Sequence, residues 1–325
     1  MKHMQSWISA LVAGAAVIAT AVSAQTFPEK PVKIIVPFTA GGLADALARG
    51  LGNELTKVWS QSVIVENRPG ANTIIAADAT AKSPADGYTL LMANDPTLSS
   101  NQYFYTKLAY DPVKDFVPVV NIAGTLEVLV VSDAFKGKTV ADLVAAAKAS
   151  PGSMTYGSYG PGSKAHLDAE KFAQITGTKL NHIPYKGVAD VMVAAAGSQI
   201  QMAFTGVPPA LPMIKAGKLR ALAIASPTRS KSLPDTPTFA EVGFPGFESK
   251  AWFGLVAPAG TPKAIVDKTA ADVQKIIVQP EFQERFVTGV GLELINQGPA
   301  QYAEFLKKDR AEYAEQAKTV NVKLD

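Results

Sequence analysis

Apolar runs of strand length alternate with segments of helical periodicity along most of the chain. Residues 34–36 are continuously apolar, and Leu47, Leu51 and Leu55 then recur at every fourth position, which predicts an amphipathic helix over 44–58. Short apolar strands followed by such helices are typical of parallel sheets that are covered on both faces. The pattern therefore predicts the α/β fold class.

The first third of the chain predicts one parallel sheet. Strands and helices alternate at 34–36, 44–58, 62–66, 72–82 and 88–93, and Asn72 is a candidate N-cap. Right-handed crossovers bring the carboxyl ends of such strands to one edge, where ligands bind in open α/β sheets. We expect residues 39–42 and 94–97, beginning with Asn94, to meet at this edge.

The pattern restarts after a long extended segment at 116–131, which we expect to be interrupted near 123–125. The later strands are expected at 154–156, 180–184, 199–204, 219–225, 252–257 and 292–295. The later helices are expected at 139–150, 164–176, 188–196, 210–216, 262–278, 281–287 and 299–319. The return to the first sheet predicts two lobes with a cleft between them and a two-stranded hinge. We assign residues 25–124 and 249–325 to a discontinuous first lobe and 125–248 to the second lobe.

The first 24 residues have the features of a secretory signal. Lys2 and His3 precede a small, apolar stretch at 7–22, and small residues at 22–24 predict cleavage after Ala24. The stretch is too short to remain as a membrane span. We therefore expect a protein exported to the periplasm that is soluble and monomeric once the signal is removed.

Composition removes several classes of function. The chain has no cysteine, which excludes disulfides, thiol catalysis and a lipid-modified cysteine. A formal net charge of +3, with no basic cluster, argues against nucleic acid as a partner. His166 and His182, the histidines outside the signal, have no metal-ligand spacing with acids, so we expect neither a metal nor a cofactor.

Two glycine-containing loops each connect a predicted strand to a predicted helix. Residues 37–42 contain Gly41 and Gly42, and residues 157–163 repeat the arrangement. Glycine permits positive φ and close approach of a ligand, and the helix N-terminus that follows favours an anion. Either loop alone is equally well explained as an ordinary strand-to-helix turn. Two such loops, one in each lobe, favour a shared anion site.

An enzyme on the same scaffold would need a titratable pair that faces the cleft. The candidates are Asp45, Asp95 and His166. Asp45 is more simply explained as an acid that complements its helix dipole, and His166 as a residue that orders the second loop. We therefore predict no catalytic residue and treat a cleft enzyme as the alternative.

Several stretches spread over the chain together form a recognisable pattern. The first is Val-Pro-Phe-Thr-Ala-Gly-Gly at 36–42 with Asp45, followed by Val-Glu-Asn-Arg-Pro-Gly-Ala at 65–71. The others lie at 85–90, 110–116, 156–158 with His166 and Leu167, 183–187, 217–223 and 252–255. In this order and over nearly the whole chain, these stretches resemble the substrate-binding receptors of tripartite tricarboxylate transporters, the Bug-type periplasmic proteins.

The resemblance implies a two-lobed, type II-like periplasmic binding protein that closes on an organic anion and delivers it to a membrane permease. It also implies that the two loops jointly hold one carboxylate. Backbone N–H groups and hydroxyls can compensate such a charge without a buried cation. The candidate ligand-binding residues are Phe38, Thr39, Ala40, Gly41, Gly42, Asn94, Ser158, Tyr159, Gly160, Ser163, His166 and Thr205.

The chain departs from the family pattern at positions that bear on the ligand. Leu43 replaces a frequent third glycine, and Lys164 occupies a position that is commonly small or hydroxylic. Lys164 either pairs with a second carboxylate or points to solvent, and we expect solvent. Thr205 follows Phe204 where amino-acid-binding members have an acid, so we expect a di- or aromatic carboxylate without an α-ammonium group. A ligand-sensing adaptor for a membrane sensor kinase remains a further alternative.

Overall fold

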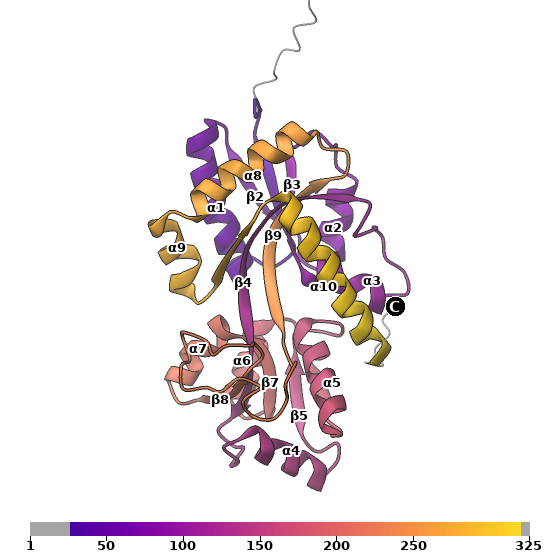
Figure 1. The fold of residues 1–325 in the computed structure, drawn as a ribbon, viewed down its shortest axis with the longest axis vertical. Coiled ribbons are helices and arrows are strands. Elements are labelled where there is room, and N and C mark those ends of the chain that lie inside the picture. Colours follow the sequence, from indigo (N-terminus) through magenta and orange to yellow (C-terminus); the bar gives the residue numbers. More distant parts are fainter. Residues whose placement is uncertain (1–26, 320–325) are drawn as a thin grey trace, which may run out of the picture.

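Two lobes joined by two long strands make up the part of the chain that the structure describes (Figure 1). The structure is a computed structural model, and it describes residues 27–319. The predicted signal and its cleavage after Ala24 lie outside this range. No helix within residues 27–319 combines the length and hydrophobicity needed to cross a bilayer.

The upper lobe in Figure 1 contains a sheet with the order β2-β1-β3-β9-β4. Strand β1 is parallel to β2 and β3, whereas β9 is antiparallel to both β3 and β4. The elements of this part are β1 (Val32–Val36), α1 (Leu43–Trp59), β2 (Val63–Asn67), η1 (Ala71–Thr73), α2 (Ile74–Ala81), β3 (Thr89–Asn94), the π-helix η2 (Pro96–Ser100), α3 (Asn101–Phe104), β9 (Lys250–Pro258), α8 (Lys263–Ile277), α9 (Pro280–Phe286), η3 (Thr288–Val290), β10 (Glu293–Gln297) and α10 (Pro299–Thr319).

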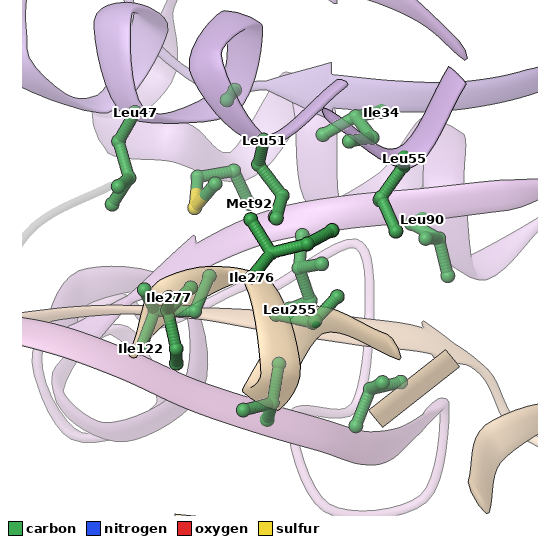
Figure 2. Packing of buried hydrophobic residues seen from close by; sticks show 14 of the residues in the cluster. Ile34, Leu47, Leu51, Leu55, Leu90, Met92, Ile122, Leu255, Ile276 and Ile277 are labelled. Atoms are coloured by element: carbon green, nitrogen blue, oxygen red, sulfur yellow. The ribbon is translucent and has the colours of Figure 1, made fainter. Parts of the chain in front are cut away.

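One apolar stripe attaches α1 to this sheet. Figure 2 shows Leu47, Leu51 and Leu55 on the face of α1 that points toward Met92 and Ile276. The three leucines are at most 1% exposed. Full burial of such a side chain contributes about 1.5–3 kcal/mol. The stripe fixes the position of α1, and with it the position of the loop that precedes the helix.

The lower lobe is built on the strand order β4-β7-β5-β6, with β8 also paired to β4. Strand β5 is parallel to its neighbours β6 and β7. The elements are β4 (Phe116–Ser132), α4 (Val140–Ala149), β5 (Thr155–Ser158), α5 (Lys164–Thr176), β6 (Asn181–Pro184), α6 (Val188–Ala196), β7 (Met202–Gly206), α7 (Val207–Lys215) and β8 (Leu219–Ile224).

Strands β4 and β9 run between the lobes (Figure 1). The expected interruption of β4 near 123–125 is wrong, because β4 continues as one strand of 17 residues. A Cβ on Gly124 would lie 3.0 Å from the carbonyl oxygen of Ala251 on β9. Gly124 therefore permits close approach of the two strands, which is a second common reason for glycine within a strand.

The expected helix at 72–82 is shorter than the sequence indicates. Asn72 is not an N-cap, because it lies within η1 at φ +44° and α2 begins only at Ile74. Its amide instead donates to Asn101 Oδ1 at 2.9 Å, and the amide of Asn101 donates back to the carbonyl of Asn72. This pair links η1 to α3, which was not predicted, and the long-range contact outweighs the local capping preference.

Candidate functional site

The carboxyl edges of the two sheets face each other across the strands that join the lobes. Asn94, the last residue of β3, is aligned through Phe253 of β9 with Ala123 of β4. Gly206, the last residue of β7, is aligned with Glu127 of the same strand. Because β7 is antiparallel to β4, its carboxyl end points back toward the upper lobe. Four residues of β4, about 14 Å at the usual rise, separate the two edges.

The first candidate loop connects β1 to α1 and is ordered by Asp45. The backbone N–H of Gly41 donates to Asp45 Oδ2 at 2.9 Å, and Arg49 Nε donates to the same oxygen at 3.0 Å. Asn67 donates to Asp45 Oδ1 and to the carbonyl of Phe38. Burial opposes ionisation, but the hydrogen bonds from Arg49, Gly41 and Asn67 outweigh it and lower the pKa of Asp45. An ionised Asp45 therefore holds the loop at neutral pH.

The second candidate loop connects β5 to α5 and is ordered in a parallel way. The backbone N–H of Gly162 donates to His166 Nδ1 at 3.0 Å, again four residues further along the chain. The N–H of Gly160 donates to Ser158 Oγ at 3.2 Å, and His182 Nε2 lies 2.6 Å from the same oxygen. The amides of Gly160 and Gly162, like that of Gly41, are thus used inside their own loop.

Both loops leave open space at the facing edges, and the helix that follows the first loop has an uncapped end. A Cβ built on Gly41 or Gly160 would meet no atom of the described residues within 4 Å. The N-cap of α1 is Gly42, which has no side chain with which to cap the helix. The first-turn amides of a helix have no acceptor within the helix, so the start of α1 can receive an anion.

At the start of α5, one backbone N–H group has a hydrogen-bond acceptor, whereas the hydroxyl of the N-cap residue has no partner among the described residues. The hydroxyl of Tyr159 accepts from the backbone N–H of Ala165 in the first turn. Ser163, the N-cap, is 1% exposed, and its Oγ has no hydrogen-bond partner among residues 27–319. A buried hydroxyl without a partner is uncommon and costs free energy. Ser163 is therefore a strong candidate to contact a ligand.

The strand-edge candidates Asn94 and Thr205 differ in their partners. Asn94 Oδ1 lies 2.6 Å from Thr97 Oγ1 and accepts from the Thr97 backbone N–H at 3.3 Å. Thr205 is 1% exposed, and its Oγ1 has no partner within the described part of the chain. Phe38 is half-buried, and residues 39–42 are exposed. The structure thus brings each candidate to one of two facing edges, six of them on each side.

Lys164 does not point to solvent, so that expectation is wrong. Its side chain is buried and its Nζ lies 3.2 Å from Asp168 Oδ1 and 5.2 Å above the ring of Tyr313. Burial alone would lower the pKa of Lys164, but Asp168, Asp95 and Glu127 together raise it. The sequence could not reveal this cluster, because its members come from α5, β4, α10 and the end of β3.

The three candidates for a catalytic pair bond to separate partners. Asp45 bonds within the first loop and His166 bonds within the second, whereas Asp95 accepts from the hydroxyl of Tyr313 at 3.0 Å. Burial, with a contribution from Asp309, raises the pKa of Asp95 to about 7 against the opposing charge of Lys164. Among residues 27–319, no three His, Asp or Glu side chains gather as metal ligands do.

Sequence reasoning did not include Asn67 and His182 among the functional residues. Asn67 is the last residue of β2, at the same sheet edge as the first loop, and His182 lies beside Tyr156 in the parallel register of β5 and β6. A usable signal was present in both loops: a side chain that can accept a hydrogen bond stands four residues after a glycine, at Asp45 and at His166.

The fold and the two facing loops define a two-lobed solute-binding protein. The model of the tripartite tricarboxylate transporter family receptor matches residues 47–321, and the chain belongs to this family. It is 41% identical over 251 residues to protein BugT of Bordetella pertussis, covering 77% of each chain. The predicted fold class and family resemblance are confirmed.

Two solved structures from Rhodopseudomonas palustris share the whole architecture. One, Rpa4515 with adipate, is 33% identical with a TM-score of 0.85, covering 91% of this chain and 99% of the other. The other, MatC with bound malate, is 28% identical with a TM-score of 0.82, covering 90% of this chain and 100% of the other. These relatives are solute-binding proteins, and the chain is accordingly a periplasmic-type solute-binding receptor.

Proposed function

We propose that this receptor captures a small organic carboxylate, a dicarboxylate in the first instance, and delivers it to the membrane permease of a tripartite tricarboxylate-type transporter. The observation that carries the proposal is the pair of loops at facing sheet edges, one with an uncapped helix end and one with an unpartnered buried hydroxyl. Adipate and malate, bound by the two relatives, make this ligand class the first to test. We further propose export to the periplasm with cleavage after Ala24.

The chemistry of the two edges favours a carboxylate over an amino acid. First-turn amides of α1 and the hydroxyl groups of Ser163 and Thr205 suit an anionic group. Thr205 carries no charge with which to receive an α-ammonium group. We assign the lobes to residues 25–124 with 249–325 and to residues 125–248, and we propose that they close around the ligand as a monomer.

A ligand panel tests the proposal. Protein stripped of carried-over ligand by unfolding and refolding is titrated with adipate, malate, benzoate and glutamate, and binding is followed by calorimetry and thermal unfolding. A ligand at one hundred times its Kd should add about 2.7 kcal/mol of stability. We expect adipate or malate to bind and glutamate to have no effect. Failure of every carboxylate, or a preference for glutamate, would contradict the proposed ligand class.

Two further measurements address the alternatives. Native mass spectrometry of freshly purified protein gives the mass of any co-purifying ligand. Adipate recovered unchanged after prolonged incubation would remove the cleft enzyme. Loss of uptake of the bound acid in cells that lack the chain, restored by the chain itself, would separate the transport receptor from a sensor adaptor.

A further inference from the structure

Two histidines and a tyrosine form a ring cluster directly beneath the second loop. The rings of His166 and His182 are 4.1 Å apart and 9° from parallel. His182 also stacks on Tyr156, at 4.9 Å and 15°. The hydroxyl of Tyr156 donates to Glu170 Oε1 at 2.6 Å. The cluster therefore joins β5, β6 and α5 at the point where the loop begins and ends.

The hydrogen bonds of the cluster require a particular protonation state. His166 Nδ1 accepts from the backbone N–H of Gly162, so this nitrogen carries no proton. A proton on Nδ1 would set two donors against each other in a site that is 8% exposed. The single proton of a neutral His166 is therefore on Nε2.

The surroundings of both rings favour the neutral form. Tyr156 from β5 stacks on both rings, and the charge of Glu170 from α5 acts on His182. Burial, and then the neighbouring His182, lower the pKa of His166 to about 4. Burial also lowers the pKa of His182, against the opposing charge of Glu170. Both rings are thus neutral throughout the range near pH 7.

We propose that His166 and His182 are a neutral pair of positioning residues that holds the second loop in its ligand-receiving shape. His166 fixes Gly162, and His182 fixes Ser158, which in turn accepts from Gly160. The loop then presents Ser163 toward the facing edge without rearrangement when a ligand arrives, which lowers the cost of binding. This inference rests on the proposed role of the loop as half of a carboxylate site.

Matched substitutions separate the effect of losing the hydrogen-bond acceptor from the effect of losing side-chain volume. His166→Ala removes the acceptor, whereas His166→Asn places an amide oxygen near the position of Nδ1 and cannot titrate. With adipate as the probe at pH 7.5, we expect His166→Ala to raise Kd at least tenfold and His166→Asn to recover most of that loss. His182→Ala and His182→Gln should show the same order. Binding by His166→Ala that equals wild type would overturn the proposal.

The pH profile gives a readout that a merely structural role would not change. Only neutral His166 accepts from Gly162, so the affinity of wild type relative to His166→Asn should fall about twofold at pH 4 and about tenfold one unit lower. Protonation of adipate itself affects both proteins equally and cancels in this ratio. A ratio that stays constant over the same range would contradict the positioning role.

A ligand-free measurement keeps the inference separate from the proposed function. In amide NMR spectra, the Gly162 signal of wild type should shift as His166 titrates, and the same signal should not shift in His166→Asn. If adipate fails to bind either protein, the ligand class is wrong while this titration still tests the pair. If the Gly162 signal ignores the protonation of His166, the inference is overturned even if adipate binds. The comparison needs only these two proteins if His166→Ala does not fold.

Discussion

Asp45 accepts the backbone N–H of Gly41 at 2.9 Å across one turn of chain. This bond fixes the residue with positive φ in the first loop, and it uses a carboxylate that also binds Arg49 and Asn67. The first loop is therefore shaped by a side chain of the helix that it precedes.

Replacing Asp45 with Asn should weaken both the loop and the fold. One carboxylate oxygen becomes an amide donor that must face Gly41 or Asn67, and both of these are donors. A buried donor without an acceptor costs about 1–3 kcal/mol. We expect a loss of stability of this size in urea unfolding and weaker adipate binding by calorimetry. Glu54→Gln, a partly exposed position of the same helix that pairs with Lys57, is the control and should change stability by less than about 1 kcal/mol.

Substituting alanine at Gly41 should impair binding through the backbone alone. Gly41 has φ +88°, which side-chain-bearing residues rarely adopt, whereas the space around its Cβ position is open. The strain should cost about 1–2 kcal/mol or displace the loop. Gly187→Ala is the matched control, because Gly187 also has open space but lies at φ −168°. Equal effects of the two substitutions on adipate affinity would refute this account.

The pH dependence of Asp95 should be visible in stability. Its pKa is about 7 in the folded protein and 3.8 as an unperturbed group, so the folded state binds the extra proton between these values. Stability from this group is therefore full below pH 3.8 and lost as pH rises to 7, by at most about 4 kcal/mol. Asp95→Asn should gain stability relative to wild type between pH 5 and pH 8 in urea unfolding. A difference that is flat over this range would contradict the buried, proton-binding state.

The leucine stripe of α1 should dominate the stability of the upper lobe. Leu51 is fully buried, and Leu51→Ala should cost about 2–5 kcal/mol in chemical unfolding. Val58→Ala on the same helix, where the side chain is 54% exposed, should change stability by less than about 0.5 kcal/mol. Similar losses for the two variants would mean that α1 is not anchored by this face.

Local patterns predicted the regular elements well, and contacts between distant segments account for the errors. Helices α5 and α6 begin and end at the residues expected from the sequence, 164–176 and 188–196. Lys164 was misplaced, because the tertiary fold brings Asp95 and Glu127 from two other segments beside it, in addition to Asp168 on its own helix. Asn72 was misread for a similar reason, since its bonds to Asn101 accompany a backbone with positive φ, which is not the extended conformation of an N-cap residue.

For the candidate site, the loops were predictable but their internal bonding was not. Glycines after a strand identify both loops, since this pattern depends on neighbours in the sequence. The use of the Gly160 amide depends on Ser158 and on His182, which is 24 residues away from that serine along the chain. A sequence pattern does not predict a contact between residues so far apart, so the hydrogen bonds of the glycine N–H groups are visible only in the three-dimensional structure.

The final helix touches both halves of the molecule. Arg310 donates to the carbonyl of Leu98 in the upper lobe, and Gln316 donates to the carbonyl of Leu167 on α5 (Figure 1). A rotation that brings the two loops together must therefore either keep or shift these contacts of α10, while β4 and β9 bend between the lobes. We expect closure of the lobes to pivot about β4 and β9 while the contacts of α10 keep the two lobes together along this flank.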